Sequence, residues 1–291
     1  MAVVLKRSEK HMPQECRYGC CTEVYGKNVK RIRRRIKHGS KSLFKREVRE
    51  GQYALDWDGW ESRVTGRERM LILCSPHNPG GRVWTAGELR QVAEFCAAHD
   101  LILVSDEIHH DLVLPGSPRH TVTALAAPEI ADRLVTLTAA TKSFNLAGAH
   151  LGNAIIPDAG LRARYAARMG ALGISPGLFG PPMVAAAYSP EGAAWIDALV
   201  AYLAENARVF DAGIAAIPGA RSMRLQETYL SWVDFSGTGI DAEGLRARVE
   251  GSGAKLVITA DEAPRGGRRT ALKMDGRRKA APQVVSRASS R

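Results

Sequence analysis

Residues 69–106 read RMLILCSPHNPGGRVWTAGELRQVAEFCAAHDLILVSD, and this stretch decides the fold. The run 69–75 has the length and composition of a buried strand, and the Pro and Gly residues of 76–81 predict a turn after it. Thr85, with a Glu three residues later, forms the capping-box pattern that opens a helix. Residues 101–105 form a second apolar run. A strand, a turn, a helix and a strand in this order predict two neighbouring parallel strands.

The same alternation of elements continues toward the C-terminus. The pattern predicts further strands at 134–138, 152–156 and 228–235, and helices at 161–172 and 195–210. Apolar residues recur at helical spacing in the last of these helices, which is enough to bury one of its faces. We therefore expect an α/β fold with a mostly parallel sheet and helices on both faces, followed by a partial small α+β domain.

Charge divides the chain into an acidic body and two basic ends. The formal net charge is +11, but residues 1–50 carry 15 Lys and Arg against 5 Asp and Glu, and residues 251–291 carry 10 against 3, which leaves the middle with a net charge of −6. We expect four segments: a basic, poorly ordered segment at 1–50, a partial large domain at 51–194, a partial small domain at 195–252 and a basic, disordered tail at 253–291.

Composition argues against several classes of protein. The apolar runs are too short to cross a bilayer, and no secretory signal follows Met1, so we expect no membrane association and no secretion. Five unevenly spaced cysteines form neither a disulfide framework nor a paired zinc-ligand pattern, so we expect no metal site and a cytoplasmic location. The basic run 27–37 could be a phosphate-binding arm, but residues 1–50 show no helix-turn-helix pattern, and nucleic-acid binding is not expected.

Three polar residues, Asn78, Asp106 and Lys142, each follow a predicted strand. In a parallel sheet, ligands bind at the carboxyl ends of the strands, where the loops converge. A lysine amine can form an imine with an aldehyde, and a carboxylate can stabilise the positive charge of a protonated pyridine nitrogen. An amide N–H can hold a phenolate oxygen of the same ring. Together the three residues indicate a site for pyridoxal 5'-phosphate, whose protonated ring is an electron sink.

Each of these residues also has a structural interpretation. Asn78 could be a turn residue of the NPGG segment, Asp106 could cap a helix, and Lys142 could be a solvated side chain. The presence of all three at matched strand ends favours a cofactor site over three separate coincidences.

The body of the chain, from about residue 53 to 236, resembles the fold type I, class I/II aminotransferase family, and within it the branch of cystathionine beta-lyases, also called cysteine-S-conjugate beta-lyases. Four segments carry the resemblance: CSPHNPGGRVWT (74–85), VSDEIHHDLVLPG (104–116), TLTAATKSFNLAG (136–148) and ETYLSWVDF (227–235). The resemblance implies the large domain of a pyridoxal phosphate-dependent transferase.

The resemblance also implies a role for each site residue. Lys142 would bind the cofactor aldehyde and move the proton at the substrate α carbon, and Asp106 would pair with the ring nitrogen. Asn78 would bond the ring oxygen. His109 stands where many relatives place a tyrosine toward that same oxygen, although it could equally be a loop histidine.

The activity that the resemblance implies is a carbon-sulfur β-lyase reaction in a homodimer. A small amino-acid thioether, cystathionine or a cysteine S-conjugate, would undergo α,β-elimination to a thiol, pyruvate and ammonia. An aminotransferase shares the first steps and stays an alternative, as does a non-catalytic cofactor-binding or regulatory fragment. The two basic ends do not resemble the family, so we expect a truncated or frame-disrupted member, a change that could leave the chain inactive.

Overall fold

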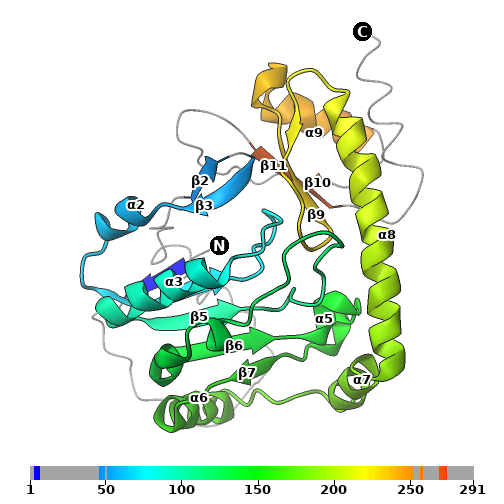
Figure 1. The fold of residues 1–291 in the computed structure, drawn as a ribbon. Helices are drawn as coiled ribbons and strands as arrows, with labels where there is room; N and C mark the ends of the chain where they lie inside the picture. The colour runs from blue at the N-terminus through cyan, green and yellow to red at the C-terminus, as the bar shows by residue number, and fades with distance from the viewer. Residues whose placement is uncertain (1–2, 7–45, 50, 252–255, 258–268, 274–291) are drawn as a thin grey trace, which may run out of the picture.

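The computed structural model describes residues 3–6, 46–49, 51–251, 256–257 and 269–273 (Figure 1). The basic run 27–37 and the cysteines at 16, 20 and 21 lie outside these residues. The strands are β1 (Val3–Lys6), β2 (Arg46–Arg49), β3 (Gln52–Leu55), β4 (Glu68–Cys74), β5 (Ile102–Asp106), β6 (Leu134–Thr138), β7 (Asn153–Ile155), β8 (Arg221–Ser222), β9 (Leu230–Asp234), β10 (Leu256–Val257) and β11 (Arg269–Lys273). The helices are α2 (Trp57–Glu61), α3 (Ala86–Ala98), α4 (Thr123–Ala126), α5 (Ala140–Ser143), α6 (Ala159–Ala171), α7 (Gly180–Ala187), α8 (Pro190–Ala215) and α9 (Ala242–Gly251), with short 3-10 helices η1 (Pro128–Arg133), η2 (Ala147–Ala149) and η3 (Ser236–Thr238).

The main sheet has five strands in the order β1-β4-β5-β6-β7. The three central strands run parallel, which confirms the strands expected at 69–75, 101–105 and 134–138. The edge strands β1 and β7 run antiparallel to their neighbours. The strand expected at 152–156 is present as β7, and it runs against β6 because the short turns α5 and η2 do not carry the chain back across the sheet.

Helix α3 packs against one face of this sheet (Figure 1). It begins as expected at a capping box, in which the Thr85 hydroxyl accepts from the Glu88 N–H at 3.2 Å. Its apolar side chains join the core that contains Leu71 of β4 and Leu103 of β5, both fully buried. Alternate residues along β4 and β5 face this core, so the alternation along each strand fixes which face α3 covers.

The opposite face of the sheet is covered less completely. Val104, Val135 and Ile156 form a small buried cluster there, and Leu161 of α6 packs against it. Met70 of β4 lies on the same face and is only partly buried. The hydrophobic core of the large domain therefore lies mainly on the α3 side.

A second sheet has the strand order β10-β11-β9-β8, and it lies near α9 at the other end of the molecule from α6 (Figure 1). Strand β9 matches the strand expected at 228–235, and β10 and β11 fall within the segment 253–291. The helix expected at 195–210 is the longer α8, whose N-terminus is set by Ser189 as N-cap and by Pro190 in the first turn. It runs along one side of the molecule from the second sheet to α7 (Figure 1).

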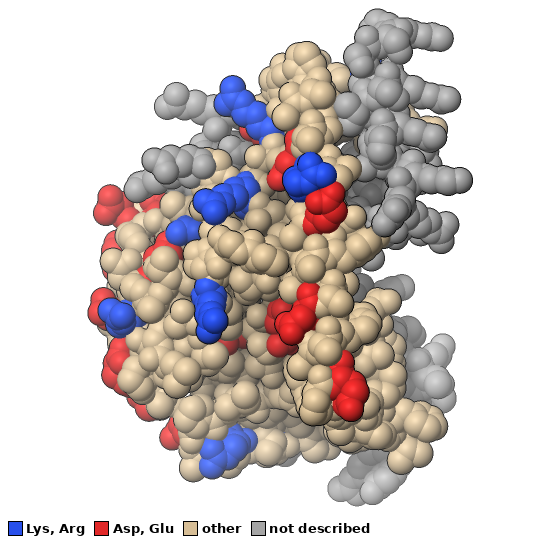
Figure 2. Space-filling model, turned by 45° about the vertical axis from the view of Figure 1, so that its right-hand side comes forward, with Lys and Arg blue, Asp and Glu red and all other residues tan. Residues whose placement is uncertain are grey.

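Large apolar side chains are exposed around α7 and α8. We call this set the α7–α8 apolar surface, and it comprises Leu172, Ile174, Leu178, Phe179, Met183, Tyr188, Trp195, Tyr202 and Val209. Figure 2, in which the α8 side comes forward, shows broad uncharged areas between separate charged side chains. None of the helices within the described residues is long and apolar enough to cross a membrane.

Candidate active site

The site residues lie at the carboxyl edge of the three parallel strands. In the register of the sheet, Asp106 lies beside Cys74, the last residue of β4, and beside Leu137 near the end of β6. Asn78 follows β4 in the next turn, and Lys142 follows β6 in α5. The structure therefore brings Asn78, Asp106 and Lys142 to the same edge, as the strand ends in the sequence suggest.

The turn that carries Asn78 is tightly packed. The His77 N–H donates to the Arg82 carbonyl at 2.7 Å, and the Gly81 N–H donates to the His77 carbonyl at 2.8 Å. A Cβ atom at Gly80 would lie 2.4 Å from His77 Nδ1 and 2.4 Å from a carbon of the Tyr53 ring, so only glycine fits there. The NPGG segment thus fixes the backbone from which the Asn78 side chain extends.

Asn78 is bonded to His109, and His109 is bonded to Thr228. Asn78 Nδ2 lies 2.9 Å from His109 Nε2, and Thr228 Oγ1 lies 3.1 Å from His109 Nδ1. Since the amide nitrogen donates, His109 Nε2 accepts, and its Nδ1 carries the proton toward the Thr228 hydroxyl. Burial, followed by the charge of Lys142, lowers the pKa of His109 to about 4. His109 is therefore a neutral imidazole at neutral pH, and it orients the amide of Asn78.

Asp106 is a partly buried carboxyl group with spare acceptor capacity. Burial raises the pKa of Asp106 above its ordinary value, while the Ile108 backbone N–H and the charge of Lys142 act in the opposite direction. Its Oδ1 atom is buried and has no hydrogen-bond partner among the described residues. A positively charged donor placed there would satisfy that oxygen and favour the ionised carboxylate.

The polar atoms of the site match the polar atoms of pyridoxal phosphate. The orphaned Oδ1 of Asp106 suits a protonated ring nitrogen. Asn78 Nδ2 has two N–H groups, so it can serve His109 and a ring oxygen together. Lys142, whose charge acts on both Asp106 and His109, supplies the amine. These residues fit the cofactor that the sequence indicates.

The sequence did not point to Thr228, which fixes the ring orientation of His109. Thr228 lies 119 residues from His109 along the chain. It reaches the site because its N–H donates to the Leu112 carbonyl at 2.9 Å, while the Gln226 N–H donates to the Gly81 carbonyl at 2.7 Å. The segment before β9 is thereby held against the loop after β5 and the turn after β4. No local spacing signals this contact.

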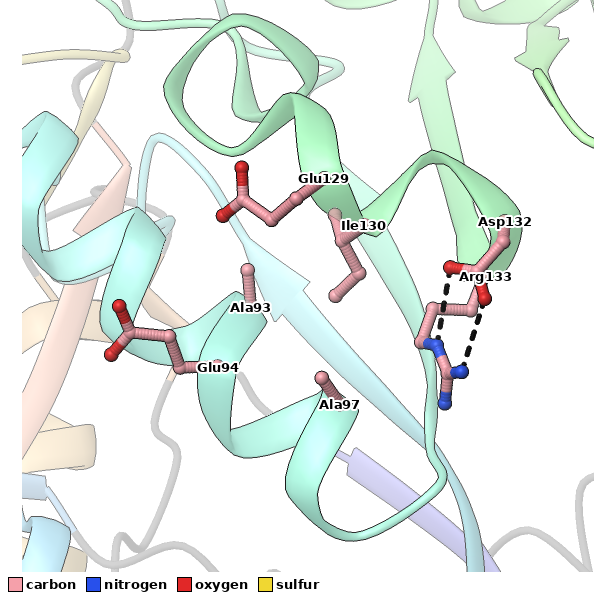
Figure 3. Close-up of a pocket in the computed structure, with 7 residues that line it drawn as sticks. All are labelled: Ala93, Glu94, Ala97, Glu129, Ile130, Asp132 and Arg133. Carbon is pink, nitrogen blue, oxygen red and sulfur yellow. Dashed lines mark hydrogen bonds and ion pairs between the residues drawn. The ribbon is translucent and has the colours of Figure 1, made fainter.

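Two cavities border other parts of the fold. One, of about 190 Å³, lies between α3 and η1, and it contains none of the four site residues (Figure 3). It is lined by Ala93, Glu94, Ala97, Glu129, Ile130, Asp132 and Arg133. The other, of about 240 Å³, adjoins α5 and is lined by Asp111, Phe144, Ala187, Tyr188, Ser189, Ala193, Ile196 and Asp197.

Comparison with known proteins agrees with this geometry. The model of the family "Aminotransferase class I and II" matches residues 39–258. Cystathionine beta-lyase PatB of Bacillus subtilis is 36% identical over 214 residues, which cover 72% of this chain and 54% of PatB. The chain therefore spans about half the length of that curated relative.

Solved structures show the same fold. Cystalysin from Treponema denticola, which contains pyridoxal 5'-phosphate, superposes with a TM-score of 0.73 at 27% identity, over 84% of this chain and 61% of cystalysin. The N-succinyldiaminopimelate aminotransferase from Mycobacterium tuberculosis superposes with a TM-score of 0.73 at 29% identity, over 84% of this chain and 63% of that enzyme. The chain belongs to the class I and II aminotransferase family of pyridoxal phosphate-dependent enzymes.

Proposed function

We propose that this chain binds pyridoxal 5'-phosphate through Asn78, Asp106, His109 and Lys142 and acts as a carbon-sulfur β-lyase on small amino-acid thioethers. The observation that carries the proposal is the position of Asp106 between the ends of β4 and β6, which brings an amide, a carboxyl and an amine to one edge of the sheet. The likeness to PatB supports cystathionine or a cysteine S-conjugate as the substrate class.

Each residue has a separate task in the proposed reaction. When bound, the cofactor supplies an electron sink for the negative charge that forms at the substrate α carbon. Lys142 would hold the cofactor aldehyde until the amino group of the substrate displaces it there, and the freed lysine amine would then take the α proton as the thiolate leaves from the β carbon. Asp106 keeps the ring nitrogen protonated, and Asn78, oriented by His109, holds the ring oxygen. Addition of water then gives pyruvate and ammonia beside the thiol.

An absorbance experiment tests cofactor binding. Purified protein mixed with pyridoxal phosphate should give the visible band of lysine-bound cofactor, and Lys142→Ala should abolish it because the variant lacks the lysine amine whose charge reaches both Asp106 and His109. Lys273→Ala, which removes a different lysine, should keep the band. A parent chain without the band would overturn the proposal.

Product analysis separates the lyase from the second candidate. An aminotransferase is supported by the likeness to the N-succinyldiaminopimelate enzyme, and it differs in where the proton returns. Release of pyruvate from cystathionine indicates elimination, and exchange of an amino group with a keto acid indicates transamination. The band without either product indicates a non-catalytic cofactor-binding protein.

We also propose that the folded chain is a cytoplasmic homodimer. The α7–α8 apolar surface supports the dimer, because exposed apolar patches of this kind mark contact surfaces with other chains. Cys74 and Cys96 are free thiols, which is consistent with a reducing compartment.

A further inference from the structure

Lys142 lies on a helix that has little intrinsic stability. Helix α5 is four residues long, and its N-cap residue, Ala139, offers no side-chain hydrogen bond. Helices of about one turn do not persist without contacts to the rest of the protein. The position of Lys142 relative to Asp106 and His109 therefore depends on what holds α5.

A hydrogen bond joins this helix to the loop that follows β5. The hydroxyl of Ser143, which is buried, donates to Asp111 Oδ2 at 2.7 Å. The Tyr188 hydroxyl at the end of α7 approaches the same oxygen at 3.5 Å. Asp111 belongs to the loop that carries His109 and directly follows Asp106, the last residue of β5, so one carboxylate connects that loop to the residue next to Lys142.

His110 holds the other oxygen of this carboxylate. His110 Nε2 lies 3.0 Å from Asp111 Oδ1, and His110 Nδ1 lies 2.7 Å from the Glu107 carbonyl. The Glu107 carbonyl can only accept, so His110 Nδ1 carries a proton and donates to it, while Nε2 forms an ion pair with Asp111 when the ring is protonated. The hydrogen bond to Asp111 raises the pKa of His110, although burial opposes this. For Asp111, burial raises the pKa, but the hydrogen bonds from His110 and Ser143 outweigh it and bring that pKa below its ordinary value.

We infer that Asp111, which lies against His110, is a positioning residue that fixes Lys142 through Ser143. Within the described residues, the polar contacts of the Asp111 side chain are to Ser143, Tyr188 and His110, and not to the Lys142 amine or the residues that would hold the cofactor ring. Asp111 sets the distance between two elements that must act together, the loop that follows Asp106 and carries His109, and the helix with Lys142. This inference rests on the proposed function, since it concerns the geometry in which Lys142 meets the cofactor.

Three variants and a matched control test this role. Ser143→Ala removes the bond to α5 and leaves the pair between Asp111 and His110 intact. Asp111→Ala removes both, and Asp111→Asn keeps an acceptor for Ser143. Ser105→Ala is the control, because Ser105 is equally buried, also donates to a carboxylate, that of Glu107 at 2.8 Å, and also adjoins a site residue.

The readouts are the dissociation constant for pyridoxal phosphate, measured from the visible band, and the pH at which that band shifts. Ser143→Ala and Asp111→Ala should raise the dissociation constant about tenfold or more, equivalent to about 1.4 kcal/mol. Both should also move the titration of the band, which a loss of general stability would not do. Asp111→Asn should lie between Asp111→Ala and the parent.

The outcomes distinguish the inference from the proposed function. If the parent shows no band, both fail. If the parent binds and the Ser143 and Asp111 variants bind and titrate like it, the inference alone is overturned. An equal effect of Ser105→Ala on the dissociation constant and the titration would also overturn it, because the effect would then not depend on the link to α5.

Discussion

His109 is a histidine placed where it cannot carry a charge at neutral pH. Its side chain is 2% exposed, and both ring nitrogens are engaged, one by Asn78 and one by Thr228. Burial and then the nearby charge of Lys142 lower its pKa to about 4. A neutral ring can accept from the Asn78 amide, whereas an imidazolium cannot. The orientation of Asn78 therefore depends on the ring staying neutral.

This lowered pKa predicts a loss of stability in acid. The unfolded chain binds a proton at His109 near the ordinary value of 6.5, while the folded chain does so only near 4. Between these values the unfolded state binds more protons, so stability falls as the pH falls. The loss at pH 4 is about 3 kcal/mol, since one pKa unit corresponds to about 1.4 kcal/mol. Urea unfolding of the parent and of His109→Gln at pH 7 and pH 4.5 should give a smaller decrease for the variant.

The control for this measurement is an exposed histidine. His150 lies on the surface in the left-handed conformation, which asparagine tolerates well. His150→Asn should follow the pH dependence of the parent. If His109→Gln and His150→Asn behave alike, His109 does not govern the acid sensitivity.

Single residues of the site were predictable to different degrees. Asn78, Asp106 and Lys142 each follow a recognisable strand, and the general position of ligands at strand ends was enough to group them. The bond from Thr228 to His109 joins residues 119 apart, and the bond from Ser143 to Asp111 joins residues 32 apart. Such contacts depend on how loops pack, and no local spacing records them.

Helices and strands were predictable where local signals specify them. Thr85 and Glu88 set the start of α3, and the apolar runs set β4 and β5. The direction of β7 could not be predicted from its own residues. It is antiparallel to β6 because the connection between them, through α5 and η2, does not cross back to the other end of the sheet. The start of α8 was placed late, since the apolar stripe begins after the Ser189 cap and Pro190.

The capping box gives a prediction for α3 as an element. In Thr85→Ala the Glu88 N–H loses its acceptor, so the free energy of unfolding should fall by about 1 kcal/mol. Thermal or urea unfolding measures this change. Glu94→Ala is the control on the same helix, because Glu94 is exposed and a surface substitution of this kind changes stability by less than about 0.5 kcal/mol. Equal losses in both variants would show that the cap does not stabilise α3.

The molecule as a whole is covered unevenly. Within the described residues, the α3 side of the main sheet has the large core, whereas the other side has a cluster of three buried apolar residues and helix α6, none of whose own residues is buried. The α7–α8 apolar surface is a second region in which large apolar side chains are exposed.

This uneven coverage predicts self-association through the α7–α8 apolar surface. Leu178 is 85% exposed, so burying it against a second copy removes apolar area from water without any change inside the fold. Light scattering coupled to size-exclusion chromatography should give a parent mass above that of one chain, and Leu178→Glu should lower it toward one chain because a carboxylate in an apolar contact is costly. Leu125→Glu is the matched control, since Leu125 is 79% exposed but belongs to α4 and not to this surface. A parent of monomer mass, or an equal effect of both variants, would contradict the role of this surface in assembly.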